Sequence, residues 1–150
     1  MSNKKSWIKN EVILSIIIPV IFLVIGFFVR MYFAENAYPI DYEVIDSYDW
    51  ANMFLGLFIL STILCIIYNI AIAVIGEKFD IHSQRAWLIY GIFAIVISLI
   101  GPIYMCFGYR EESACTIIMF AMFILQHVVT FLISTYNCPR HWDFCPFKFR

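Results

Sequence analysis

Residues 86–107 read AWLIYGIFAIVISLIGPIYMCF, a stretch without a single charged side chain. A helix needs about 20 mostly apolar residues to cross the hydrocarbon core of a bilayer. Three further runs of this kind occur at 12–33, 51–75 and 113–136. They lack the two-residue alternation of barrel strands, and a helix satisfies its backbone hydrogen bonds internally. The sequence therefore predicts an all-α integral membrane protein with a bundle of four transmembrane helices.

The overall composition supports lipid as the main solvent. Of the 150 residues, 63% are hydrophobic and 14% are charged, whereas soluble domains are about half apolar and about a quarter charged. A water-soluble fold of this size leaves much of its surface exposed and could not hide so many apolar side chains. We expect one membrane domain over 1–150. It has no basic stripe, so we expect no direct binding of nucleic acid.

The charged residues predict which side of the membrane each segment occupies. The loop at 35–50 holds five acidic residues and no basic one. Eight of the ten basic residues lie before the first span, between the second and third spans, or in the tail at 137–150: Lys4, Lys5, Lys9, Lys78, Arg85, Arg140, Lys148 and Arg150. Positive loops stay in the cytoplasm, so both termini are predicted to be cytoplasmic and the acidic loop to lie outside. We expect Trp50 to anchor the outer interface and Arg30 to reach outward toward Glu35.

Small and polar residues recur on one side of two spans. Lipid tails remove most of the hydrophobic drive between helices, so such residues usually mark helix contacts. The third span has Gly91, Ala94, Ser98 and Gly101 at helical spacing, and the second has Ser61, Cys65 and Asn69. We expect these two faces, and the face of Gln126, Thr130 and Ser134 in the fourth span, to contact each other or another subunit. The first span is expected to be the most exposed to lipid.

The fourth span carries an unusual set of polar residues, namely Gln126, His127, Thr130 and Ser134. One interpretation is a pore lining or a proton-sensitive pair, because His titrates near neutral pH. The other is hydrogen bonding between helices, for instance to Asn69 or Ser61. We favour hydrogen bonding, because no intramembrane carboxylate is expected beside the histidine.

Several cysteines are candidates for bonding or metal binding. Cys106 and Cys115 flank the short outer turn, and we expect free thiols rather than a disulfide. In the tail, Cys138, His141 and Cys145 could ligate zinc, but the paired spacing of structural zinc sites is missing. We therefore predict no metal and no cofactor.

The tail also interleaves aromatic and basic side chains. These residues are typical of docking to anionic headgroups or to a protein partner: Arg140, Trp142, Phe144, Phe147 and Lys148.

No hydrolase, metalloprotease or nucleotide-binding motif occurs in the sequence, so we expect a protein without enzymatic activity. The first hypothesis is a homo-oligomeric membrane subunit that senses or scaffolds and couples to a cytoplasmic partner. The alternative is a small oligomeric ion channel or membrane-permeabilising protein, with Asn69, Gln126, Thr130 and Ser134 lining the path. A thiol-redox protein that uses the tail cysteines is the third possibility.

Three features of the layout are shared with a known family: the short basic start (Lys4, Lys5 and Lys9), four spans over nearly the whole chain, and short cytoplasmic segments. In this layout the chain resembles the four-span membrane subunit of the bacterial Kiwa anti-phage system. The resemblance implies an inner-membrane sensor in antiviral defence, working with a cytoplasmic effector that acts on nucleic acid. It assigns no role to any single residue.

Overall fold

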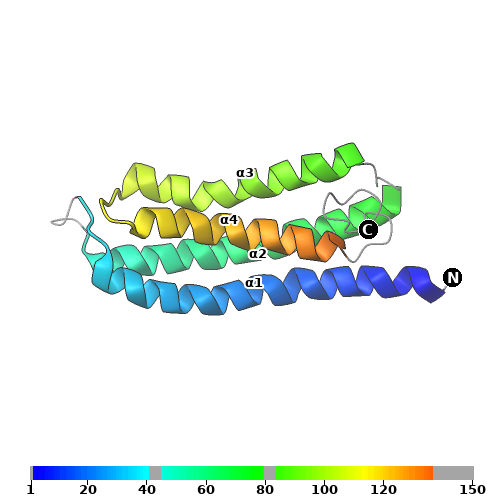
Figure 1. Ribbon diagram of the computed structural model, residues 1–150, viewed down its shortest axis with the longest axis horizontal. Helices are drawn as coiled ribbons and strands as arrows, with labels where there is room; N and C mark the ends of the chain where they lie inside the picture. Colours follow the sequence, from blue (N-terminus) through cyan, green and yellow to red (C-terminus); the bar gives the residue numbers. More distant parts are fainter. Residues whose placement is uncertain (1, 41–44, 80–83, 137–150) are drawn as a thin grey trace, which may run out of the picture.

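The computed structural model describes the backbone of residues 2–40, 45–79 and 84–136, and the side chains of 9–40, 45–76 and 85–135. The described part forms four helices: α1 (Ser2–Asn36), α2 (Ser47–Phe79), α3 (Gln84–Gly108) and α4 (Cys115–Tyr136). Successive helices run in opposite directions (Figure 1). We call the end where α1 begins and α4 finishes the terminal end. The opposite end, which holds the connections α1–α2 and α3–α4, is the hairpin end.

All four helices are long and apolar enough to cross a membrane, which confirms the predicted four spans and the all-α class. The helices extend beyond the apolar runs, most clearly at Ser2–Asn36 and Ser47–Phe79. A helix of 35 residues is about 52 Å long, whereas the hydrocarbon core is about 30 Å thick. Hydropathy marks only the part of a helix that lipid can cover, so it could not locate these polar ends.

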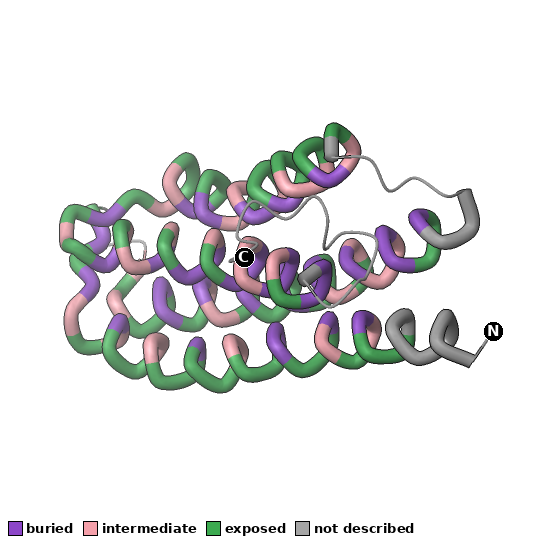
Figure 2. The backbone as a smooth tube through the Cα atoms, turned by 45° about the vertical axis from the view of Figure 1, so that its right-hand side comes forward, coloured by how far each residue is buried: buried purple, intermediate pink, exposed green. Residues whose placement is uncertain are grey.

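The helices α1 and α3 lie on opposite sides of the bundle, with α2 and α4 between them (Figures 1 and 2). Helix α1 packs along α2 and α4, and α3 packs mainly along α4. The first span was expected to be the most exposed to lipid, and it shares that position with the third span. The most apolar stretches of α1 and α3 are both 22% buried, against 39% for those of α2 and α4. Exposure therefore follows position in the bundle rather than the apolar content of a span.

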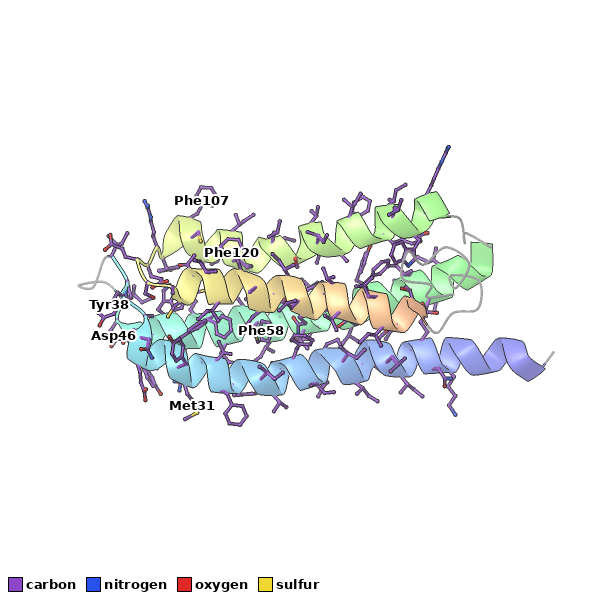
Figure 3. The ribbon with its side chains drawn as sticks, viewed as in Figure 1. Met31, Tyr38, Asp46, Phe58, Phe107 and Phe120 are labelled. Atoms are coloured by element: carbon purple, nitrogen blue, oxygen red, sulfur yellow. The ribbon has the colours of Figure 1, made fainter. Side chains whose placement is uncertain are left out.

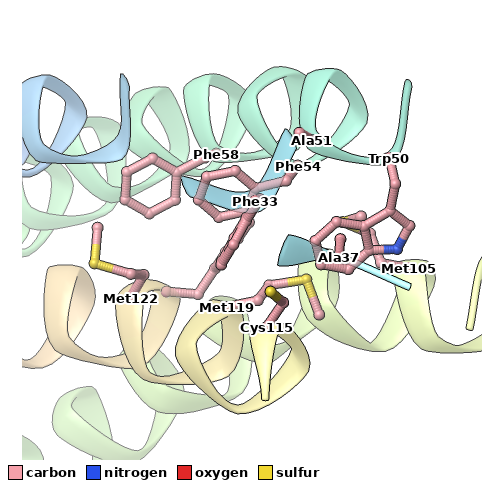
Figure 4. Close-up of a cluster of buried hydrophobic side chains, with 11 residues drawn as sticks. Phe33, Ala37, Trp50, Ala51, Phe54, Phe58, Met105, Cys115, Met119 and Met122 are labelled. Atoms are coloured by element: carbon pink, nitrogen blue, oxygen red, sulfur yellow. The ribbon is translucent and has the colours of Figure 1, made fainter. Parts of the chain in front are cut away.

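The hairpin half of the bundle has an aromatic interior (Figure 4). We call its five ring residues the aromatic cluster: Phe33, Trp50, Phe54, Phe58 and Phe123, each at most 1% exposed. Ring centroids lie 4.7 Å apart for Phe33 and Phe54 and 5.1 Å apart for Phe58 and Phe123, in edge-to-face geometry. Figure 3 shows Phe58 pointing into the bundle, whereas Met31 and Phe107 point away from it.

Trp50 belongs to this interior rather than to the membrane interface. Its indole Nε1 donates a hydrogen bond to the Tyr109 carbonyl at 2.9 Å, and only 1% of the residue is exposed. The prediction of an outer anchor at Trp50 was therefore wrong. The indole binds the α3–α4 connection, a partner from a distant part of the chain.

Glycines let two rings of the aromatic cluster approach neighbouring helices closely. A Cβ atom placed on Gly101 would lie 2.5 Å from Phe123 Cε1, and one on Gly26 would lie 2.7 Å from Phe58 Cδ1. Both distances are shorter than ordinary carbon–carbon contacts of about 3.5–4.0 Å. Gly56, by contrast, has nothing within 4 Å of the same position. Gly26 and Gly101 are therefore required by ring packing, whereas Gly56 is not.

The two connections at the hairpin end are joined by short backbone pairing. Ile40 N donates to Arg110 O and Glu112 N donates to Tyr38 O, both at 3.0 Å. Cys106 and Cys115 nearby are free thiols, as expected.

Arg30 has a different partner from the one expected. Its Nε and Nη2 atoms donate to Asn52 Oδ1 at 3.1 and 2.6 Å, and its guanidinium lies 4.4 Å from the centroid of the Tyr48 ring. The expected pairing with Glu35 was therefore wrong. Both partners belong to α2, so they became neighbours of Arg30 only when α1 and α2 packed together.

Glu111 holds the first turn of α4. Its carboxylate accepts hydrogen bonds from Ser113 N at 2.9 Å, Thr116 N at 2.6 Å and Tyr38 N at 3.3 Å, as well as from the hydroxyls of Ser113 and Thr116. Burial alone would raise the pKa of Glu111, but these hydrogen bonds outweigh it and lower the pKa. Amide donors at a helix start have no partner within the helix, so this carboxylate acts as a cap.

Candidate functional site

Seven polar side chains of α2 and α4 are buried inside the bundle and form what we call the polar network: Ser61, Thr62, Asn69, Gln126, His127, Thr130 and Ser134. None is more than 6% exposed. Polar groups in an apolar surrounding are costly unless they find partners, so their contacts decide what the network can do.

Gln126 connects three helices. Its Nε2 atom donates to Thr62 Oγ1 on α2 at 2.7 Å and to the Pro19 carbonyl on α1 at 3.4 Å. Its Oε1 atom accepts a longer bond, of 3.5 Å, from Ser61 Oγ. The side chain therefore holds α1, α2 and α4 together at one level of the bundle.

His127 lies beside Gln126 and has one partner. Its Nε2 atom is 2.9 Å from Ser61 Oγ, while Nδ1 is buried without a hydrogen-bond partner among the described residues. An unpaired buried donor or acceptor typically costs about 1–3 kcal/mol. His127 is therefore held by α2 through one nitrogen only, as far as the described residues go.

A second contact between α2 and α4 lies two helical turns closer to the terminal end. Ser134 Oγ is 3.4 Å from Asn69 Oδ1, and Asn69 Nδ2 donates to the Cys65 carbonyl at 2.8 Å. The Thr130 hydroxyl donates to the Gln126 carbonyl of its own helix at 2.6 Å and also hydrogen-bonds the Cys65 thiol of α2. The structure therefore brings the predicted polar residues of α2 and α4 together across helices: Ser61, Cys65, Asn69, Gln126, His127, Thr130 and Ser134.

The small-residue face of the third span contacts a different partner. Ala94 and Ser98 are fully buried, and Gly91 and Gly101 approach rings of α4, those of Phe131 and Phe123. Of the two expected locations, the structure places this face within the chain, against α4. The faces of α2 and α3 therefore both contact α4.

One residue of the site was missed by the sequence reasoning. Glu11 is 1% exposed and Ser15 is fully buried, with Ser15 Oγ donating to the Glu11 carbonyl at 2.7 Å. The sequence patterns assigned no role to this carboxylate. Glu11 immediately precedes the predicted first span at 12–33, but the span by helix length and hydropathy begins at Lys9. The signal was its helical spacing with Ser15 and Pro19.

An apolar groove of about 230 Å³ lies between α2 and α3, lined by side chains that include Leu60, Leu64 and Ile97. Ser61 is part of its wall, so the polar network is one side chain away from this groove.

Among the residues that the structure describes, no group of three His, Cys, Asp or Glu side chains could hold a metal ion. The candidate zinc ligands Cys138, His141 and Cys145 lie outside the described residues, as do all the docking candidates of the tail: Arg140, Trp142, Phe144, Phe147 and Lys148.

Comparison of the chain with protein-family models, with curated proteins and with solved structures finds no match.

Proposed function

We propose that this chain is a non-enzymatic, multi-pass subunit of a bacterial inner membrane that senses a change at the membrane and couples it to a cytoplasmic protein. The observation that carries the proposal is the polar network, which joins α1, α2 and α4 while His127 Nδ1 stays buried with no partner in the described part of the chain. A packed interior with an unpaired polar atom favours rearrangement when a signal supplies the missing partner, and such discrete rearrangements are how packed helices switch.

The positions of the helix ends support a signal that leaves the protein on the cytoplasmic side. Helix α4 carries Gln126, His127 and Ser134, and its last residue, Tyr136, precedes the tail at 137–150. Eight of the ten basic residues lie in the first part of α1, at the last turn of α2, at the first turn of α3, or after α4 in the sequence. The positive-inside rule therefore supports a cytoplasmic location for both termini. A shift of α4 would reach the tail directly.

Self-association remains part of this proposal, but through other surfaces than the small-residue faces. Those faces are buried within the chain, so copies would meet through the outward sides of α1 and α3. The mass of the intact assembly extracted from native membrane tests this point. A single copy per assembly would remove self-association from the proposal.

Coupling to a cytoplasmic partner is tested by co-purification from native membrane with Trp142→Ala and Phe144→Ala combined. We expect this variant to lose at least about 90% of a soluble partner at unchanged membrane level, because aromatic side chains commonly dominate contact energies. Phe107→Ala is the control, since Phe107 is an aromatic residue that is 90% exposed at the hairpin end. An assembly that contains only this chain, or one that keeps its partner in the tail variant, would overturn the proposal.

The layout resemblance to the Kiwa membrane subunit extends the proposal to anti-phage defence. Deleting the gene in its host should lower phage resistance, and unchanged resistance would remove this extension.

A second candidate function is a small oligomeric ion channel, and buried Glu11 favours it, since cation pathways commonly contain an acidic residue. Ion flux in liposomes that disappears in Gln126→Leu would support the channel over the sensor. Flux no higher than that of protein-free liposomes would exclude it.

A further inference from the structure

Glu11 lies at the same level of the bundle as the second contact of the polar network. Gln126 Nε2 contacts the Pro19 carbonyl, and α1 and α4 run in opposite directions. Glu11 is two turns from Pro19 toward the terminal end, and Ser134 is two turns from Gln126 toward the same end. Glu11 is also buried, on the same side of α1 as Ser15 and Pro19. The helix register therefore places Glu11 at the level of Ser134 along the bundle axis.

Two titratable side chains in this half of the bundle each have an unpaired atom. Glu11 Oε2 and His127 Nδ1 are the buried side-chain polar atoms of the described residues that lack a hydrogen-bond partner. They are separated by about two helical turns, or about 11 Å along the bundle axis, and the Thr130 hydroxyl lies at a level between them. A buried carboxylate needs a proton or a cation to balance its charge in apolar surroundings.

The surroundings of the two groups contain few other charges. In the described part of the terminal half, the other titratable or cationic side chains are Lys9 on α1, Cys65 and Tyr68 on α2, and Arg85 and Tyr90 on α3. Lys9 and Arg85 are exposed, and the Tyr68 hydroxyl donates to the Tyr90 carbonyl at 2.6 Å. Cys65 is buried and contacts Asn69. None of these contacts pairs a cation with Glu11.

The aromatic interior of the hairpin half blocks proton exchange toward the hairpin end. Phe33, Phe54, Phe58 and Phe123 fill the interior beyond Gln126, and all four are fully buried. Their stacked and edge-to-face contacts leave hydrocarbon where a proton path would need polar groups. The polar network can therefore exchange protons only toward the terminal end.

We propose that Glu11 and His127 form a proton-binding site that exchanges with the solution at the terminal end of the bundle only. Glu11 takes up a proton at a carboxylate oxygen and His127 takes one up at Nδ1, and each proton is released again to the water at the terminal end. Only protons move, so no redox partner or leaving group is involved. The inference deepens the proposed function by naming a proton as the signal, but it does not depend on a cytoplasmic partner.

The test uses the full chain reconstituted in liposomes with one orientation, with the infrared band of a protonated carboxyl group as readout. We expect a band that titrates when the pH changes on the terminal side and disappears completely in Glu11→Gln. Glu112→Gln is the matched control, because Glu112 is an exposed acid at the hairpin end. The helical circular dichroism of each variant verifies folding.

His127 has a separate readout in the imidazole signals of the three histidines in nuclear magnetic resonance spectra. His127→Gln should remove one imidazole signal that follows the pH of the terminal side, whereas His82→Gln should remove a different signal and leave that one in place. A Glu11 band that follows the pH of the hairpin side, or that changes with Na⁺ at fixed pH, would overturn the inference. Loss of partner binding with intact proton exchange would instead count against the proposed function alone.

Discussion

The two halves of the bundle are held together by different forces. In the hairpin half, five aromatic side chains pack against each other and against Gly26 and Gly101. In the terminal half, hydrogen bonds of Gln126 and Ser134 connect the helices. Within lipid, apolar packing gains through van der Waals contact, whereas interhelical hydrogen bonds contribute about 0.6–2 kcal/mol each. The difference indicates a rigid half, set by shape, and an adjustable half, set by polar partners.

Adding side-chain volume in the rigid half should lower the free energy of unfolding by the largest amount. Gly101→Leu forces side-chain atoms into the Phe123 ring, and we expect the free energy of unfolding to fall by about 3 kcal/mol. Reversible unfolding in mixed detergent micelles measures the change. Gly56→Leu is the control, because nothing lies within 4 Å of a Cβ atom there. Equal losses in the two variants would contradict a shape-limited hairpin half.

Removing the polar connection in the adjustable half should have a smaller effect. Gln126→Leu loses the bonds to Thr62 and Pro19, so we expect unfolding to become easier by about 1–2 kcal/mol. Ser98→Ala also removes a buried hydroxyl, but one that donates to the Ile95 carbonyl of its own helix. Its loss should be less than half as large in the same unfolding assay. A reversed order would show that the interhelical bonds do not hold this half.

The smallest effect is expected at the hairpin-end cap, where it depends on pH. Because hydrogen bonds lower the pKa of Glu111, the ionised cap stabilises the fold above the ordinary pKa of 4.5, and this contribution is lost as the pH falls through the lowered value. At neutral pH, Glu111→Gln should cost about 1 kcal/mol, as typical helix caps do. Its unfolding free energy should then fall less steeply with acid than that of the original chain. Glu112→Gln should match the original chain, and an equally flat profile there would refute the assignment.

Sequence patterns predicted some contacts of the polar site and missed others. Four polar residues at helical spacing indicated one face of the fourth span, and Ser61 and Asn69 were named as its partners. Glu11 was missed because it stands at the edge of an apolar run, where hydropathy does not distinguish a buried acid from a solvated one. Thr62 and Pro19 were missed because a hydrogen-bond partner on another helix has no fixed spacing in the sequence.

The sequence by itself determined the four helices that can span a membrane. Hydropathy and length are local properties, and each segment's own values decide whether it can cross a bilayer. Only the tertiary structure decided which side of each helix faces inward. It buried Trp50 against Tyr109, paired Arg30 with Asn52, and turned Glu11 into the interior. Each of these outcomes depends on the level at which two distant helices meet, and that level follows from how glycines and aromatic rings fit together across the bundle.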